Sequence, residues 1–568
     1  MSTEEDLAAI ALPGRYVAIV AAAVEDMLSA QDEDGCFGSW KGAKPFHPSS
    51  QTPLWPLGFL WRTEHPHNPF AGDARLLEAA IRSGDFLASQ SDEQGRFRYD
   101  QRGYQIHHVD QWLCYAWLET LLLLEEELGS ERSARWRRQL HAAAGYVAES
   151  IREWNALGGP FHTRSFGTSP NHAVTRAAFI YRAGMTLDEP AWCTTADAFV
   201  SRFLKLQDAD GCWPEYEGPV IAYAQVSLAG VAEYAEWSGN AEARAAVERT
   251  VPFMARTYYP DGGPIPLFDG RQQHTSSSPW AHFAMSRTPE GRALCDVLSR
   301  ALCRGSRYGI GGHYRLVENY VHYHAGPVGR LPMDDDTFTH RFHRTAGVRK
   351  AHAWMWALSG IVTPSFDTVP WAMERQSLLS LYHTSAGRIL SGANCKQHPE
   401  AATFVSASTR PDHLPRSTSL DDDVTHVDAV YDTFQAMLTV EVVDEQTFQI
   451  DARVVGVDGD QRVCFHLQPA VHHGGTVRLN GEERSLGDED WEVSGVRTLA
   501  WDAVSLDFDA PARVWWPFRG YNPYAADHTY EDLSSARLIV EFFMTSGDAC
   551  RRVKVTVSSP GRPGGESR

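Results

Sequence analysis

The chain has 568 residues, of which 43% are hydrophobic and 22% charged, and its formal net charge is -20. The length favours two or three domains, and the composition is that of a globular protein. The acidic balance excludes a general nucleic-acid binder, which needs a basic surface. Any anionic substrate must therefore be held by a local group of cationic and amide side chains.

The first residues, MSTEEDLAAIALPGRY, are acidic and lack the basic start and apolar stretch of a signal peptide. The sequence contains no run of about 18 apolar residues, which is the length that a membrane-spanning helix needs. The nine cysteines are an odd number and form no CxxC motif, which favours a reducing compartment. We expect a cytoplasmic protein, or a secreted one if a signal has been removed from this sequence.

The first half of the chain, from Arg15 to about Arg304, has apolar residues at three- and four-residue steps, which predicts helices. The clearest segments are 15–31, 74–90, 110–129, 134–151 and 241–259.

A glycine turn repeats between these helices. QDEDGCFG begins at Gln31, QSDEQGRF at Gln90 and QDADGCWP at Gln207, with weaker copies at Asn155 and Tyr259. The spacing suggests a repeat of about 58 residues, the length of a helical hairpin. Stacked hairpins predict an α/α toroid if the last meets the first, and an open solenoid if it does not.

The second half has a period of two and many β-branched residues, which predicts an antiparallel β-sandwich. The fold class is therefore a multi-domain α+β protein, with a toroid followed by a sandwich. We expect a toroid over residues 1–305, a linker with the first strands over 306–345, and the sandwich over 346–568.

Two polar clusters fall at helix starts. Asn171 and His172 follow Pro170 at the head of one helix, and Tyr223 lies in the first turn of a helix about one repeat later. Equivalent points on successive repeats lie side by side in a toroid, so Tyr223 and His172 could face the same groove. Each residue also has a structural interpretation: Asn171 as a helix cap, His172 as a surface residue and Tyr223 as a core aromatic.

The toroid, the sandwich, the Asn-His pair and the later tyrosine together resemble the polysaccharide lyases of the alginate lyase and heparinase II/III type. The resemblance in architecture covers nearly the whole chain, and the motif match covers Asn171 to Tyr234. The His-x-His-x-Asp signature of the β domain in that family is absent. The resemblance implies β-elimination on an acidic, uronic-acid-containing glycan, with no metal or organic cofactor required.

By this resemblance, Asn171 would bind the uronate carboxylate, and His172 would neutralise it or take the C5 proton. Tyr223 would be the general acid, or both acid and base. A further histidine would come from the β domain, where we select His383, with His322, His324 and His352 as rivals. Some related lyases also hold a structural metal ion in that domain, which this resemblance makes a possible cofactor.

The candidate substrate-binding residues lie close to these helix starts. GYQIHHVDQW places His107 and His108 at the head of another helix, and PFHTRSFG places His162 and Arg164 just before Asn171. Arg164 could bind a sugar carboxylate bidentately.

Three alternatives share this scaffold. A glycoside hydrolase would need two carboxylates across the groove, for which Asp110, Glu215 and Glu217 are candidates. A uronate C5-epimerase would use nearly the same residues as a lyase. A glycan-binding protein without catalysis would lose only affinity when Tyr223 is replaced.

The acidic stretch MDDDTFTH (333–340) suggests two other functions. A class II terpene cyclase has an Asp-x-Asp-Asp motif, but Met333 occupies the place of the first aspartate and a β-rich half has no counterpart there. A metal could bind Asp334, Asp335 or Asp336 with His340 or His343, but without a tight ligand pattern we expect a solvated loop. The oligomeric state is not encoded in any motif.

Overall fold

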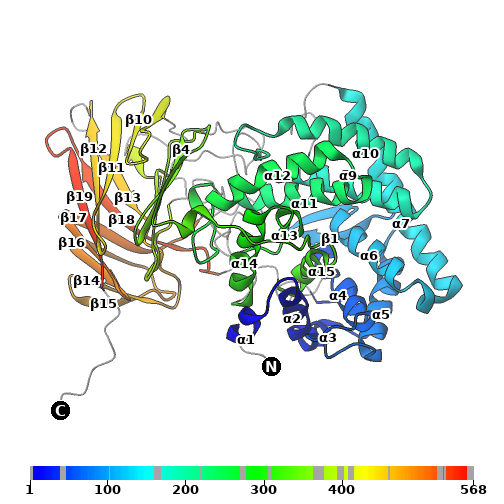
Figure 1. Ribbon diagram of the computed structural model, residues 1–568. Helices are drawn as coiled ribbons and strands as arrows, with labels where there is room; N and C mark the ends of the chain where they lie inside the picture. Colours follow the sequence, from blue (N-terminus) through cyan, green and yellow to red (C-terminus); the bar gives the residue numbers. More distant parts are fainter. Residues whose placement is uncertain are drawn as a thin grey trace, which may run out of the picture. The chain divides into compact units, whose positions relative to one another are not determined.

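The computed structural model describes residues 4–38, 46–101, 103–158, 168–215, 220–268, 277–304, 309–362, 377–392, 402–406, 415–457, 459, 461–520, 527, 529 and 532–558. They form two compact units, one helical and one built of strands (Figure 1). The helical unit comprises Met1–Tyr216, Val220–Ala255 and Ser276–Leu331, and the β unit comprises Glu217–Pro219, Arg256–Thr275 and Pro332–Arg568.

The helical unit has inner helices that are buried on nearly all sides and outer helices with one buried face. The inner helices are α4 (Leu54–Arg62), α6 (Gln111–Leu123), α9 (Pro170–Thr186), α11 (Ile221–Ser238) and α15 (His313–Val321). The outer helices are α3 (Val24–Ala30), α5 (Ala74–Gln90), α7 (Glu125–Leu157), α10 (Pro190–Phe203), α12 (Ala241–Arg256) and α14 (Pro289–Cys303). Helix α2 (Gly14–Ala22) is buried on all sides from Arg15 to Ala21. Two short helices, α1 (Glu4–Ala9) and α13 (His282–Met285), complete the unit.

The inner helices close into a ring. Helix α6 packs on α4, α9 on α6, and α11 on α9, while α15 contacts α4. The ring is joined where Thr52 Oγ1 donates to the carbonyl of Gly311 (2.9 Å) and where Phe59 lies 5.4 Å from Tyr320. The closed arrangement agrees with a toroid and excludes an open solenoid.

Neighbouring inner helices run parallel. Between α6 and α9, Gln111 lies beside Thr175, and Glu119 pairs with Arg182 further along both helices. Between α9 and α11, Gly230 lies against Thr175, and Tyr234 contacts Tyr181. Contact positions that increase together on both helices require parallel axes, so the N-terminal ends of these helices lie at the same end of the ring.

The repeated glycine turns join successive hairpins. In each turn one aspartate side chain, from Asp32, Asp92 or Asp208, accepts two backbone N–H groups. Gly211 has φ of 83°, and a Cβ there would lie 2.1 Å from the carbonyl oxygen of Arg249 on α12. Only glycine fits this close approach, which explains why the turn sequence recurs.

The expected linker 306–345 is divided between the two units, which corrects that expectation. Its first part forms helix α15, in which Tyr314 and Val317, and Leu316 and Tyr320, follow the helical spacing of an apolar face. The first strand of the β unit begins only at Thr337. The many His and Tyr residues of the segment obscured this helical period in the sequence.

The β unit contains a five-stranded and a twelve-stranded sheet, and all strand pairs are antiparallel. The smaller sheet, in the order β3-β4-β5-β6-β7, has β3 (Thr337–Arg341), β4 (Ala346–Ala351), β5 (Trp354–Ser359), β6 (Leu379–His383) and β7 (Gly387–Leu390). The larger sheet follows β15-β14-β16-β17-β19-β12-β11-β10-β9, with β18 beside β17, β13 beside β18 and β8 beside β13.

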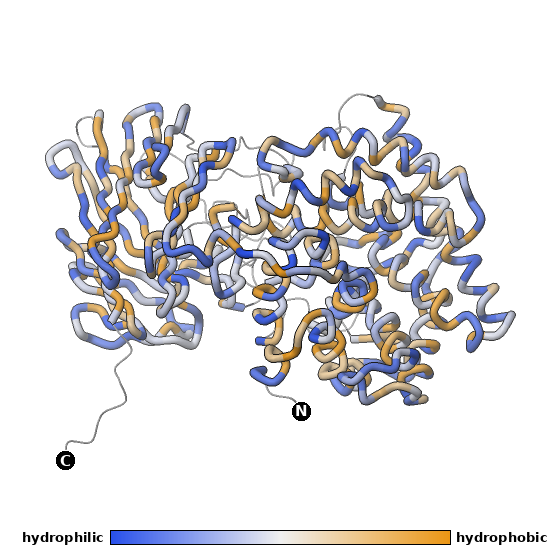
Figure 2. The backbone as a smooth tube through the Cα atoms, in the orientation of Figure 1, coloured by the Kyte–Doolittle hydropathy of each residue, from blue (hydrophilic) through white to orange (hydrophobic). Residues whose placement is uncertain are grey.

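The strands of the larger sheet are β8 (Phe404–Ser406), β9 (Ser417–Leu420), β10 (His426–Val430), β11 (Gln435–Asp444), β12 (Thr447–Val455), β13 (Val463–Leu467), β14 (Thr476–Leu479), β15 (Glu482–Ser485), β16 (Trp491–Trp501), β17 (Val504–Phe518), β18 (Arg537–Met544) and β19 (Cys550–Val557). Hydrophobic and hydrophilic residues alternate along many of these strands (Figure 2). The rings of Trp354 and Trp356 on β5 contact Phe448 on β12, so the two sheets share one core. A sandwich is therefore observed, as its sequence predicts.

None of the described helices combines the length and the apolar character that a membrane crossing requires. The eight described cysteines are all free thiols.

Candidate functional site

Asn171 is fixed at the head of α9. Ser169 precedes the helix and Pro170 occupies its first turn, where a missing N–H costs no hydrogen bond. The Asn171 side chain is 1% exposed, and its Oδ1 accepts a hydrogen bond from Ser169 Oγ (2.7 Å). The amide is thereby oriented, and its Nδ2 donor has no acceptor among the described residues.

His172 is held by α6. Gln111 Nε2 donates to His172 Nδ1 (3.3 Å) and to Thr175 Oγ1 (3.3 Å). The ring of His172 lies 4.6 Å from that of Trp112. Because an amide N–H only donates, Nδ1 accepts and a neutral imidazole carries its proton on Nε2. The arrangement makes Nε2–H the donor of His172.

Tyr223 lies in the first turn of α11, as expected, and its side chain is partly exposed. A Cβ on Gly230 would lie 3.1 Å from Thr175, so α9 and α11 approach closely at that level. Parallel axes then place the first turn of α11 beside the first turn of α9. Asn171, His172 and Tyr223 are therefore on neighbouring helix starts.

Hydrogen-bond donors without partners gather at these starts. Within the described chain, Gln225 Nε2 and Trp112 Nε1 are buried and have no acceptor. Gln225 lies five residues before Gly230, at the level of Pro170, and Trp112 contacts His172. The N-terminal ends of α6, α9 and α11 add partial positive charge at the same level. This surrounding favours an anionic group.

His107 and His108 lie on a hairpin and not at a helix start, which corrects the expectation. They end β2 (Tyr104–His108), which pairs with β1 (Phe97–Gln101), and α6 begins only at Gln111. His107 Nε2 pairs with Asp92 Oδ2 (2.9 Å), so it supports the glycine turn. His108 Nε2 accepts from Arg176 Nη2 on α9, one turn after His172. Both His162 and Arg164 lie outside the described residues.

His383 belongs to the β unit, where its side chain is held by hydrogen bonds and by packing against a tryptophan. It ends β6 and is 5% exposed. Its Nε2 lies 3.0 Å from the carbonyl oxygen of Glu445, and its Nδ1 accepts from the backbone N–H of Ser385 (3.2 Å). The ring packs against Trp354 at 4.6 Å, and burial lowers the pKa of His383.

The rival histidines also have structural partners. His322 packs against Trp237 at 5.2 Å, and burial lowers its pKa. His324 Nε2 lies 2.8 Å from Glu236 Oε1. His352 forms the turn between β4 and β5 with φ of 53°.

The carboxylates of the hydrolase alternative have different surroundings. Asp110 caps α6, because its Oδ1 accepts the backbone N–H of Leu113 (2.9 Å), and burial raises its pKa. Glu215 is 5% exposed, and Glu217 lies outside the described residues.

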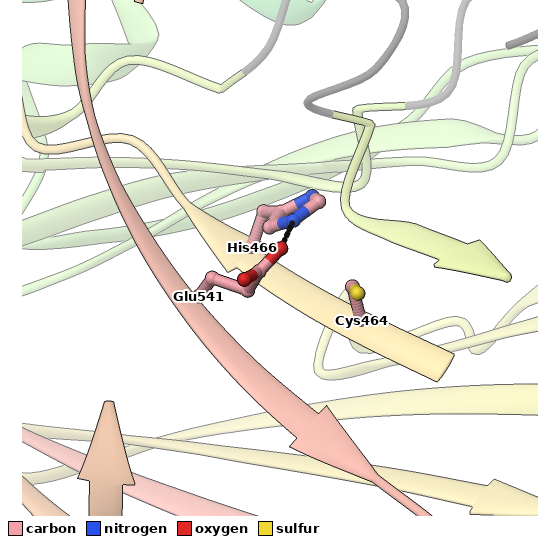
Figure 3. Close-up of side chains that lie close together, drawn as sticks. All are labelled: Cys464, His466 and Glu541. Carbon is pink, nitrogen blue, oxygen red and sulfur yellow. Dashed lines mark hydrogen bonds and ion pairs between the residues drawn. The ribbon is translucent and has the colours of Figure 1, made fainter. Parts of the chain in front are cut away.

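A metal ion could be held in the β unit by Cys464 and His466 on β13 and Glu541 on β18 (Figure 3). One possible ligand atom of each residue lies within 4.8 Å of those of the other two, so among the described residues these three are close enough together to coordinate one ion. Sulfur, nitrogen and oxygen donors fit zinc, and His466 Nδ1 is fixed by the carbonyl of Ala402 (2.9 Å). His466 Nε2 already lies 3.0 Å from Glu541 Oε2, and Arg513 Nε lies 2.7 Å from Glu541 Oε1, so the carboxylate is neutralised without a metal.

The acidic stretch at Asp334, Asp335 and Asp336 is exposed, and with His340 and His343 it forms no such cluster within the described chain. The exposure of the three aspartates is what a solvated stretch requires.

The sequence did not single out Gln111, Trp112 or Arg176 as site residues. Gln111 and Trp112 open α6 as Asn171 and His172 open α9, and Arg176 follows His172 by four residues. Helix-start position and four-residue spacing were the available signals, but both also fit ordinary core residues.

Comparisons with known proteins agree on the fold. No protein-family model and no curated protein matches the chain. The chain is similar to the crystal structure of heparinase III over 97% of its length and 86% of that chain, with a TM-score of 0.54 and 13% identity. It is also similar to the chondroitin AC lyase of Streptomyces coelicolor A3 in complex with chondroitin sulphate, over 97% of its length and 80% of that chain (TM-score 0.51, 13% identity). A tyrosine-to-alanine mutant of that lyase aligns over 99% and 83% (TM-score 0.51, 14% identity). The chain therefore has the fold of heparinase III and chondroitin AC lyase, which confirms its resemblance to heparinase-type lyases at the level of architecture.

Proposed function

We propose that the protein is a polysaccharide lyase that cleaves an acidic, uronic-acid-containing glycan by β-elimination. The observation that carries the proposal is the pair of buried unpartnered donors, Gln225 Nε2 and Trp112 Nε1, which lie with Asn171 at the starts of three parallel inner helices. Buried donors without acceptors are costly, and a carboxylate would satisfy them. The similarity in fold to two lyases of acidic glycans supports the same substrate class.

The uronate carboxylate would bind at the start of α9. Asn171 Nδ2 would donate to one carboxylate oxygen and His172 Nε2–H to the other, while Gln111 holds the imidazole in that tautomer. Hydrogen bonds to the carboxylate lower the cost of removing the C5 proton, because the negative charge that develops is spread onto these oxygens.

Tyr223 would move the proton. Its phenolate takes the C5 proton, the C–H electron pair forms the C4=C5 double bond, and the C4–O glycosidic bond breaks. The phenol then returns the proton to the leaving oxygen, so the two products carry one double bond and one new hydroxyl. A tyrosine on the helix next to the carboxylate-binding residues can serve both steps on one face of the sugar.

The test is the ultraviolet absorbance of the new double bond. Purified protein and its Tyr223→Phe variant would be mixed with alginate, heparan sulfate, hyaluronan, chondroitin, ulvan and glucuronan. We expect absorbance to rise with at least one glycan and to stay flat with Tyr223→Phe. New reducing ends without absorbance would overturn elimination and favour hydrolysis through carboxylates such as Asp110.

A further inference from the structure

Arg176 is a buried cation beside the proposed site. It lies on α9 four residues after His172, and it is 9% exposed. Side chains of a helix lean toward its N-terminus, so the guanidinium of Arg176 reaches back toward the level of His172. Its Cζ lies 5.7 Å from the ring centroid of Trp154 on α7.

No carboxylate of the described residues forms a direct ion pair with Arg176, although the buried Asp110 is near enough to stabilise its charge. Its recorded hydrogen bond within the described chain is the one from Nη2 to His108 Nε2, and its Nε is buried without an acceptor. Burial, with the charges of Arg176 and Arg96, lowers the pKa of His108 to about 4, so His108 is neutral near pH 7. Burial also lowers the pKa of Arg176 to about 10, although Tyr146, Asp110 and Tyr99 oppose this.

Arg182 on the same helix provides the contrast. Its Nε lies 2.6 Å and its Nη2 3.2 Å from the two carboxylate oxygens of Glu119, and its guanidinium stacks on Trp237. A buried arginine is normally stabilised in this way, by a carboxylate that neutralises it. Arg176 is also buried, but no carboxylate oxygen of the described residues bonds to its guanidinium.

We propose that Arg176, with His108, binds an oxyanion of the glycan, either a carboxylate or a sulfate ester on the saccharide next to the one that reacts. The inference rests on the proposed function, because the glycan must first enter at Asn171 and His172. Because the guanidinium reaches back toward the level of His172, a saccharide that neighbours the reacting one can place its oxyanion beside it. The planar fork of arginine matches either oxyanion.

Measurements of glycan affinity test this inference independently of catalysis. In the Tyr223→Phe background, affinity would be measured by calorimetry for unsulfated chondroitin and chondroitin sulfate, and for heparosan and heparan sulfate. We expect Arg176→Met to weaken binding about 10- to 100-fold, the range for a lost charge-assisted hydrogen bond. A loss with the sulfated member alone identifies a sulfate, and an equal loss with both members identifies a carboxylate.

Arg176→Lys and Arg182→Lys form a matched pair in case the methionine variant fails to fold. Arg176→Lys keeps the charge but not the fork, and we expect weaker binding, whereas Arg182→Lys should keep the parent affinity. Unchanged affinity in both Arg176 variants, or an equal loss in Arg182→Lys, would overturn the inference. Absorbance that never rises while Arg176 controls affinity would reject only the elimination chemistry.

Discussion

Gln111 Nε2 on α6 lies 3.3 Å from His172 Nδ1 on α9, and this contact decides which nitrogen of the imidazole can donate. Gln111→Glu replaces the donor with a carboxylate that accepts, so Nδ1 must carry a proton and the pKa of His172 should rise. We expect kcat to fall about 10- to 100-fold and the pH–rate profile to shift upward. The measurement is kcat against pH, and an unchanged profile would contradict the proposed tautomer.

Replacement of Asn171 should reduce the rate more than replacement of its orienting partner. Asn171→Asp places a second negative charge against the substrate carboxylate, and we expect kcat/KM to fall about 100- to 1000-fold, the range for one lost oxyanion donor. Ser169→Ala removes only the hydrogen bond that orients the amide, so its loss should be smaller. Equal activity in Asn171→Asp and the parent would remove Asn171 from the site.

Two glycines of the outer helices should respond oppositely to alanine. A Cβ on Gly84 of α5 would lie 2.0 Å from the ring of Trp136, whereas one on Gly145 of α7 would meet its nearest atom, on Trp192, at 3.6 Å. Gly84→Ala should lower the free energy of unfolding by about 1–3 kcal/mol through overpacking. Gly145→Ala should raise it by up to about 1 kcal/mol, because alanine favours the helix. Calorimetric melting of both variants checks the pair, and a gain in Gly84→Ala would be inconsistent with this packing.

The buried pair of carboxylates beside Arg315 should make the stability of the helical unit fall as pH rises from about 4 to about 8. Burial raises the pKa of Glu318 to about 8, while Arg315 opposes this, and Glu233 shares the same guanidinium. The unfolded carboxyl titrates near pH ~4.3, so the folded state holds one more proton between that pH and about 8. Stability therefore falls as pH rises through this window, and the loss is complete above it.

Glu318→Gln tests this sign, because glutamine keeps the shape without titrating. Between about pH 5 and pH 8, the melting temperature of the variant should vary less with pH than that of the parent protein. A steeper pH dependence in the variant would contradict the assignment of the proton to Glu318.

The Cys464 cluster should be stable without metal. Arg513 pairs with Glu541, and burial raises the pKa of Cys464 to about 12, which keeps the thiol protonated. We expect chelator treatment to leave the melting temperature unchanged. A rise on adding zinc that Cys464→Ser abolishes would show that the trio binds metal.

The fold was largely predictable because its signals are local and repeated. Helical periods, turns such as that at Gln207 and alternating strands each depend on a few neighbouring residues. The dense His and Tyr content of 306–345 hid helix α15, whose apolar face packs on α2 and α4 near the beginning of the chain.

The candidate site was less accessible to the sequence. Asn171, His172 and Tyr223 could be placed at helix starts, since position in a repeat is visible in the sequence. That Gln111 donates to His172, and that Arg176 lacks the carboxylate which Arg182 has, depends on contacts between residues more than sixty positions apart. No spacing rule reports whether a distant partner is present.

The contact between Thr52 and Gly311 joins residues 259 positions apart in the sequence. A ribosome must therefore complete almost the whole helical unit before the first inner helix, α4, meets the last, α15. Until then the apolar face of α4, which the closed ring covers, remains exposed on the nascent chain. Folding of this unit is expected to be slow and late, and to depend on protection of the early hairpins from aggregation during synthesis.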